Sequence, residues 1–162
     1  MKPVILTTLA LAIAIASPHP ADDRPDFSGS YKLTDVKGSE KFDKTTVQTL
    51  KVAQSTDAIE VTEDLGGKPH TDKYPLDGSE GAYTSPGGIP GKCKAHFKGK
   101  SLILESLTAS RPATNAPVVE LLTVQRWELS ADKKKLAVHI EVISPNMHVS
   151  PVAPWTEIYM RD

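Results

Sequence analysis

Apolar and polar residues alternate along most of this chain, and this two-residue period is the feature that most restricts its fold. In a β-strand the side chains of residues i and i+2 lie on the same face. Ile59 and Val61, for example, alternate with Glu60 and Thr62. Comparable runs lie at residues 31–33, 50–52, 92–98, 102–104, 118–130, 136–142 and 155–160. We therefore expect an all-β, antiparallel up-and-down barrel of about eight to ten strands.

Residues 1–16 have the pattern of a secretory signal peptide. They begin with Met-Lys, continue with an apolar run that is too short to span a bilayer comfortably, and end in small residues. Cleavage is expected after Ala16, or as late as Ala21, and a short membrane anchor is the alternative. The proline-rich residues 17–26 are then a linker, and residues 27–162 form a single barrel domain. This pattern predicts a secreted or periplasmic protein whose mature form has no membrane span.

The charge of the chain bears on its partners, and its cysteine content bears on how the fold is stabilised. Lys and Arg number 19, Asp and Glu number 20, the net charge is −1, and the basic residues form no block. Electrostatic capture of nucleic acid or of an anionic membrane is therefore not expected. Cys93 is the sole cysteine of the chain. Because no internal disulfide can form, the domain depends on its hydrophobic core. We expect a monomer.

Aromatic residues gather on strand faces that we expect to point into the barrel. Such side chains either line a ligand cavity, with a few polar groups among them, or fill a solid core, and the pattern leaves both open. Thr123 and Gln125 share the face of Trp127 and need polar partners if that face is buried. The candidate ligand-binding residues are Tyr31, Tyr74, Tyr83, Thr123, Gln125, Trp127, Trp155, Glu157 and Tyr159.

Glu157 is the one acid–base side chain that the alternation places on a face that could be interior. Glu157 shares a face with Trp155 and Tyr159. If that face is interior, Glu157 is either paired with an arginine or functionally placed. His139 and Glu141 share an outer face without a visible third ligand, which favours a solvated surface over a metal site. The sequence thus predicts no catalytic residue, no metal and no other cofactor.

The start of the predicted barrel resembles a known family. Gly-Ser-Tyr at residues 29–31 is similar to the G-x-W signature that opens the first strand of lipocalins and other calycins, with Tyr in place of Trp. The resemblance implies that this aromatic residue closes one end of the barrel. It also implies a basic partner for the ring near the end of the barrel, a place that Arg161 or Arg126 would take.

Longer stretches resemble a group of secreted bacterial lipocalin-like β-barrel proteins of calycin type. Residues 26–33 match an opening D-F-S-G-x-[WY]-K-L, and residues 74–80 match a [YT]-P-x-D-G-x-E element. Residues 123–136 match the T-V-Q-R-W-x-L-S-x-D-x-K-x-L hairpin of that group. The resemblance implies a small, mostly apolar ligand in the barrel mouth, by analogy of fold.

Three function hypotheses are open at this point. The first is a secreted or periplasmic binding protein for a small, mostly apolar ligand in a barrel cavity. The second is an interaction or structural module of the cell envelope, with a solid core and contacts on the Pro- and Gly-rich connections at residues 77–91, 108–117 and 144–154. The third is an enzyme acting on a hydrophobic substrate, which needs an acid–base group inside the barrel.

Overall fold

The computed structural model describes residues 24–38, 48–64, 66–111, 115–147 and 152–162, which form ten β-strands. The strands are β1 (Gly29–Lys37), β2 (Thr49–Gln54), β3 (Ala58–Asp64), β4 (Pro69–Pro75), β5 (Gly81–Thr84), β6 (Pro90–Lys98), β7 (Ser101–Ser110), β8 (Val119–Leu129), β9 (Lys135–Ile143) and β10 (Trp155–Arg161). Across these ranges there is no helix of the length and apolar character that a membrane span requires.

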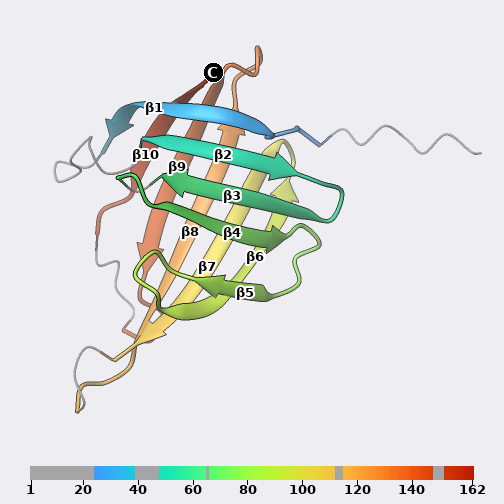
Figure 1. Cartoon of the computed structure of the whole chain (residues 1–162). Coiled ribbons are helices and arrows are strands. Elements are labelled where there is room, and N and C mark those ends of the chain that lie inside the picture. The colour runs from blue at the N-terminus through green and yellow to red at the C-terminus, as the bar shows by residue number, and fades with distance from the viewer. Residues whose placement is uncertain (1–23, 39–47, 65, 112–114, 148–151) are drawn as a thin grey trace, which may run out of the picture.

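All ten strands belong to one antiparallel sheet in the order β4-β3-β2-β1-β10-β9-β8-β7-β6-β5. Apart from β4 and β5, strands that follow one another in the sequence are paired, and β1 also pairs with β10, which gives the sheet an up-and-down barrel topology. In Figure 1 the strands β1 to β4 cross in front of β7 to β10 at a steep angle, so the sheet curls back over itself. The expected all-β, antiparallel barrel is confirmed.

The barrel wall has a seam between β4 and β5, which are the two edges of the sheet and share no backbone ladder. Side chains bridge this seam instead. The Cys93 thiol donates a hydrogen bond to the Lys73 carbonyl, with Sγ and O 3.3 Å apart. The rings of Tyr74 and Tyr83 lie 6.4 Å apart between their centroids. Burial also raises the pKa of the Cys93 thiol, so the thiol stays protonated and remains a hydrogen-bond donor across the seam.

The alternation does not predict β4 or β5. The expected single connection at residues 77–91 is wrong, because β5 divides it into a turn at 76–80 and a second connection at 85–89. β5 is only four residues long, and β4 turns polar side chains towards the interior, so neither strand has the apolar alternation of a core strand. The other two connections, 108–117 and 144–154, fall partly outside the described residues.

One end of the barrel is closed by aromatic packing around Phe27, which precedes β1. Phe27 is fully buried, and its ring lies 6.1 Å from that of Trp127 and 6.3 Å from that of Phe97. The guanidinium of Arg24 lies 5.3 Å from the centre of the Phe97 ring. We call this the Phe27 end. The opposite end, where β1, β3, β5, β7 and β9 finish, is called the loop end.

The basic partner of Tyr31 is Arg161. Its guanidinium lies 5.1 Å from the centre of the Tyr31 ring, and its Nη2 donates hydrogen bonds to the Ser28 carbonyl and the Tyr31 hydroxyl. The Tyr31 hydroxyl in turn donates to the Phe27 carbonyl at 2.8 Å. Arg126 is excluded from this role because it is half exposed and pairs with Glu128 on the outer face. Arg161 therefore ties the last strand to the start of the first.

Replacing Arg161 with methionine is expected to lower the free energy of unfolding by about 2–3 kcal/mol. Methionine keeps apolar cover over Tyr31 but removes two charged hydrogen bonds and the cation–π contact. The matched control is Arg126→Met, which should change stability by no more than about 0.5 kcal/mol because its ion pair is exposed. Urea denaturation of both variants measures the difference, and equal losses would contradict the role given to Arg161.

Candidate functional site

A cavity of about 200 Å³ lies inside the barrel and extends towards the loop end. It is bounded by β2 and β3 on one side and by β8, β9 and β10 on the other. The lining side chains are Leu50, Glu63, Thr123, Gln125, Trp127, Val138, Ile140, Val142, Trp155, Glu157 and Tyr159. Most of this wall is apolar or aromatic, and the polar groups are few, which is typical of sites that bind small molecules.

Strand register brings these side chains together. Val138 on β9 is the cross-strand partner of both Trp127 on β8 and Glu157 on β10. These three residues form one row across the inner face, and the next row lies two residues along each strand. Sequence-distant residues therefore meet in the cavity because their strands are neighbours and their positions share the same parity.

Six of the nine predicted ligand-binding residues line this cavity: Thr123, Gln125, Trp127, Trp155, Glu157 and Tyr159. The other three lie elsewhere. Tyr31 is at the Phe27 end under Arg161, and Tyr74 and Tyr83 face one another across the seam. The structure thus brings together the β8 and β10 members of the predicted set, and ligand contact by any of the nine stays a prediction.

Glu157 faces the interior, and it is held by its own strand. The Trp155 indole Nε1 donates to one carboxylate oxygen at 3.0 Å, and the Tyr159 hydroxyl donates to the other at 2.6 Å. Only 7% of the Glu157 surface is exposed. Burial raises the pKa of Tyr159, and the nearby carboxylate raises it further, so the phenol remains a donor. Of the two sequence-based alternatives, pairing with an arginine is wrong, because Trp155 and Tyr159 fill that role.

Gln125 holds the other cavity tryptophan. The Trp127 indole Nε1 donates to the Gln125 side-chain oxygen at 2.8 Å. The residues are two apart on β8, so this bond runs along one inward strand face, as the bond from Trp155 to Glu157 does on β10. Both indole rings are therefore oriented by a neighbour on their own strand, and both line the cavity.

A second carboxyl group, Glu63 on β3, also lines the cavity. Burial raises its pKa to about 7, Glu157 and Asp72 raise it by their negative charge, and His70 partly opposes the shift. The expectation that Glu157 alone brings an acid–base group to the interior is therefore wrong. The signal was present in the sequence, because Glu63 follows Val61 at the i+2 position and so continues the inward face of β3.

A histidine–aspartate pair lies next to Glu63, on the neighbouring strand β4. His70 is the cross-strand partner of Glu63, and its Nε2 lies 3.0 Å from Oδ2 of Asp72, outside linear hydrogen-bond geometry. Burial raises the pKa of Asp72, whereas His70 and the Thr84 backbone N–H lower it. Both side chains are mostly buried. Thus three carboxyl groups, with one imidazole among them, occupy this part of the interior.

Comparison with known proteins finds no matching family model and no matching curated protein. Solved structures do match. A REP1-NXSQ fatty acid transporter is 14% identical over 84% of this chain and 96% of its own, with a TM-score of 0.58. Fatty-acid-binding protein 1 of Echinococcus granulosus is 12% identical over 83% and 96%, also at 0.58. Zebrafish ileal bile acid-binding protein, complexed with cholic acid, is 17% identical over 84% and 98%, again at 0.58.

The fold is a calycin-type β-barrel. The match spans nearly the full length of each solved chain and most of this one. At these low identities the likeness concerns the fold alone. It agrees with the calycin resemblance of residues 29–31 and with the stacking of Arg161 on Tyr31.

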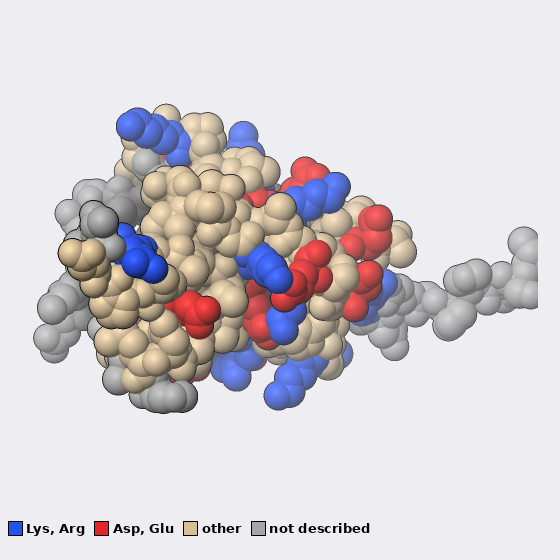
Figure 2. Space-filling model, turned by 90° about the horizontal axis from the view of Figure 1, so that it is seen from below, with Lys and Arg blue, Asp and Glu red and all other residues tan. Residues whose placement is uncertain are grey.

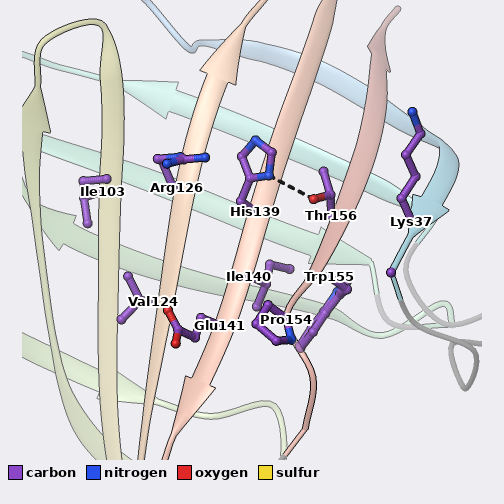
Figure 3. A pocket seen from close by; sticks show the side chains of 11 residues that line it. Lys37, Ile103, Val124, Arg126, His139, Ile140, Glu141, Pro154, Trp155 and Thr156 are labelled. Carbon is purple, nitrogen blue, oxygen red and sulfur yellow. Dashed lines mark hydrogen bonds between the residues drawn. The ribbon is translucent and has the colours of Figure 1, made fainter. Parts of the chain in front are cut away.

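The outer wall of this calycin-type barrel carries a larger hollow, about 450 Å³, over β7 to β10. Figure 3 shows Arg126, His139 and Glu141 along it, with His139 Nδ1 2.9 Å from the Thr156 hydroxyl. These charged groups lie on the outer strand faces, and Arg126 already pairs with Glu128. Among the described residues no group of three or more His, Cys, Asp or Glu side chains is arranged to hold a metal ion. The smaller internal cavity, with its buried polar groups, is the better candidate site.

Charged residues on the outside of the calycin-type barrel are mixed in sign. Figure 2 shows acidic and basic side chains next to one another on the face seen from below, beside a broad uncharged area. Exposed ion pairs on the outer surface include Lys73 with Glu60 and Lys92 with Glu80. The face in Figure 2 thus offers no basic patch for a polyanion.

Proposed function

We propose that this protein binds a small, mostly apolar molecule in the cavity inside its barrel. The observation that carries the proposal is the cavity itself, about 200 Å³ of space among Trp127, Trp155 and Tyr159 with a few fixed polar groups. A ligand site of this kind buries an apolar body and orients it through a small number of hydrogen bonds. A solid core, which the interaction-module hypothesis requires, would leave no such space.

The solved calycin-type structures support this proposal by analogy. Their names describe a fatty acid transporter, a fatty-acid-binding protein and a bile acid-binding protein complexed with cholic acid. Shared fold alone does not carry a ligand from one protein to another. The proposal therefore rests on the cavity, and the neighbours add that a barrel of this type accommodates small apolar molecules.

We further propose that the protein works outside the cytoplasm, as a secreted or periplasmic carrier of the lipocalin-like kind. Support comes from the basic start, the apolar run and the small residues of residues 1–16.

Native mass spectrometry of the protein, purified gently from a periplasmic or culture extract, tests both proposals. We expect a small-molecule mass on the folded protein that is lost on denaturation. The denatured mass should correspond to a chain that starts after Ala16 or after Ala21. A full-length mass that begins at Met1 would contradict secretion by cleavage, independently of any ligand.

A cavity-filling variant locates the bound molecule. Thr123→Phe places a ring in the cavity, and it should abolish the additional mass while the protein remains folded. Overpacking of this kind costs about 1–3 kcal/mol. Val124→Phe is the matched control, because Val124 is the next residue on β8 and lies in the outer hollow. Loss of the ligand in both variants, or in neither, would contradict binding inside the barrel.

A further inference from the structure

The polar side of the cavity is acidic. Glu63 enters from β3 and Glu157 from β10, and among the described residues that line the cavity none is Lys or Arg. Arg161, the basic residue nearest to Tyr31, is occupied at the Phe27 end by Ser28 and Tyr31. The cavity thus presents carboxyl groups to a ligand without a lining cation to balance them.

The surrounding charges strengthen this imbalance. Asp72 lies on β4 with His70, whose imidazole is beside Asp72 and opposite Glu63. Burial first, then the charge of Glu157 and then that of Asp72, raise the pKa of Glu63. Like charges at close quarters repel, and a cation between them relieves the repulsion. A ligand carboxylate, such as that of a fatty acid, would add another negative charge to the cluster.

The unused acceptor capacity of the two carboxyl groups also favours a ligand that donates hydrogen bonds. Each Glu157 oxygen accepts one bond from the protein, from Trp155 or from Tyr159, and a carboxylate oxygen has room for a second. Glu63 accepts no hydrogen bond from the described part of the chain. An ammonium group supplies N–H donors and positive charge together, and the indole ring, present twice in the cavity wall, is the aromatic group that best attracts a cation.

The size of the cavity limits the ligand. An apolar protein cavity of about 150 Å³ holds one benzene molecule. The cavity here, at about 200 Å³, has room for a single ring with a short side group.

We infer that the ligand is a small organic amine with an apolar body about the size of one ring, bound with its ammonium group between Glu63 and Glu157. The apolar body then lies against Val142, Trp155 and the other apolar side chains of the wall. This inference rests on the proposed function and adds the charge and the size class of the ligand.

Three probes of one shape test the inference: benzylamine, benzyl alcohol and benzoate, each titrated at pH 8 by calorimetry. At this pH Glu63 is ionised, because its pKa is about 7. We expect benzylamine to bind about tenfold or more tighter than benzyl alcohol, and benzoate to show no binding. Tryptophan emission gives a second readout, since the chain has two Trp residues and both line the cavity.

Charge-neutral variants identify the groups that hold the ammonium. Glu63→Gln and Glu157→Gln should each weaken benzylamine about tenfold or more and weaken benzyl alcohol much less, because a neutral hydroxyl loses only a hydrogen bond. Glu60→Gln is the matched control, because Glu60 is on the same strand as Glu63 but is half exposed on the outer face and pairs with Lys73. It should leave both affinities unchanged.

The outcomes separate this inference from the proposed function. If benzyl alcohol or benzoate binds as tightly as benzylamine, or if neither Gln variant weakens benzylamine, the amine inference is overturned and the carrier proposal stands. If none of the probes binds while the purified protein still carries a small molecule, the amine inference alone is overturned. If none binds and native mass spectrometry finds the bare chain, both are overturned.

Discussion

Trp127→Ala is expected to lower the free energy of unfolding by about 3–5 kcal/mol. Trp127 is 1% exposed and packs edge-on against Phe27 at the Phe27 end. Its cross-strand partners, Leu102 and Val138, are buried as well, so the neighbouring strands cannot close over the space that the indole leaves. The loss includes the transfer free energy of the ring and the cost of the enlarged cavity.

The control for this prediction is Trp155→Ala. Trp155 is only partly buried at the start of β10, so its removal should cost about 1–2 kcal/mol. Urea denaturation of both variants, followed by emission of the remaining tryptophan, gives the two free energies. Equal losses would show that the Phe27 end is not the more tightly packed part of the barrel. A large loss for Trp155 alone would place the main core at the loop end.

Glu63→Gln is expected to stabilise the protein by about 2–3 kcal/mol at pH 8 and to leave stability unchanged near pH 4. In the folded protein the pKa of Glu63 is about 7, above the usual value of 4.5. The folded state therefore holds the Glu63 proton more tightly than the unfolded state does. Its contribution to stability is complete below pH 4.5 and is lost as the pH rises through 7. Glutamine stays neutral and escapes that loss.

Thermal or urea unfolding at a series of pH values measures this effect as a difference between Glu63→Gln and the parent protein. Taking the difference removes the common contribution of the other acidic groups. Glu60→Gln, on the outer face of the same strand, should follow the parent curve at every pH because its carboxylate is exposed. A constant difference between Glu63→Gln and the parent from pH 4 to pH 8 would contradict a buried, unpaired carboxyl group.

The strand pattern was predictable where one face of a strand is apolar. Residues 92–98 and 136–142 correspond to β6 and β9, which bury alternate side chains in the core. Residues 118–130 correspond to β8, whose inward positions Thr123, Gln125 and Trp127 line the cavity. β4 was not predictable in this way, since His70 and Asp72 take inward positions that are usually apolar. The exceptions to the pattern are thus the residues that make the interior acidic.

The cavity residues were predictable in part, because side chains two residues apart on a strand share a face. Glu157 follows Trp155 by two and precedes Tyr159 by two, so all three share the inner face. Parity also distinguishes Arg161, two residues after Tyr159, from Arg126, which is adjacent to the inward Trp127 and must point outward. The volume of the cavity was not predictable, because it depends on how closely side chains from five different strands pack in three dimensions.

The seam between β4 and β5 also determines how much of each sheet edge is open to another chain. Strand edges present unpaired N–H and C=O groups, which readily extend into another chain and begin aggregation. Here the two edges face each other across the contact of Tyr74 with Tyr83. β4 is bounded by Pro69 and Pro75, and β5 has four residues, so each edge offers an incoming strand little to pair with. The incomplete wall therefore protects its own edges against intermolecular β-sheet growth.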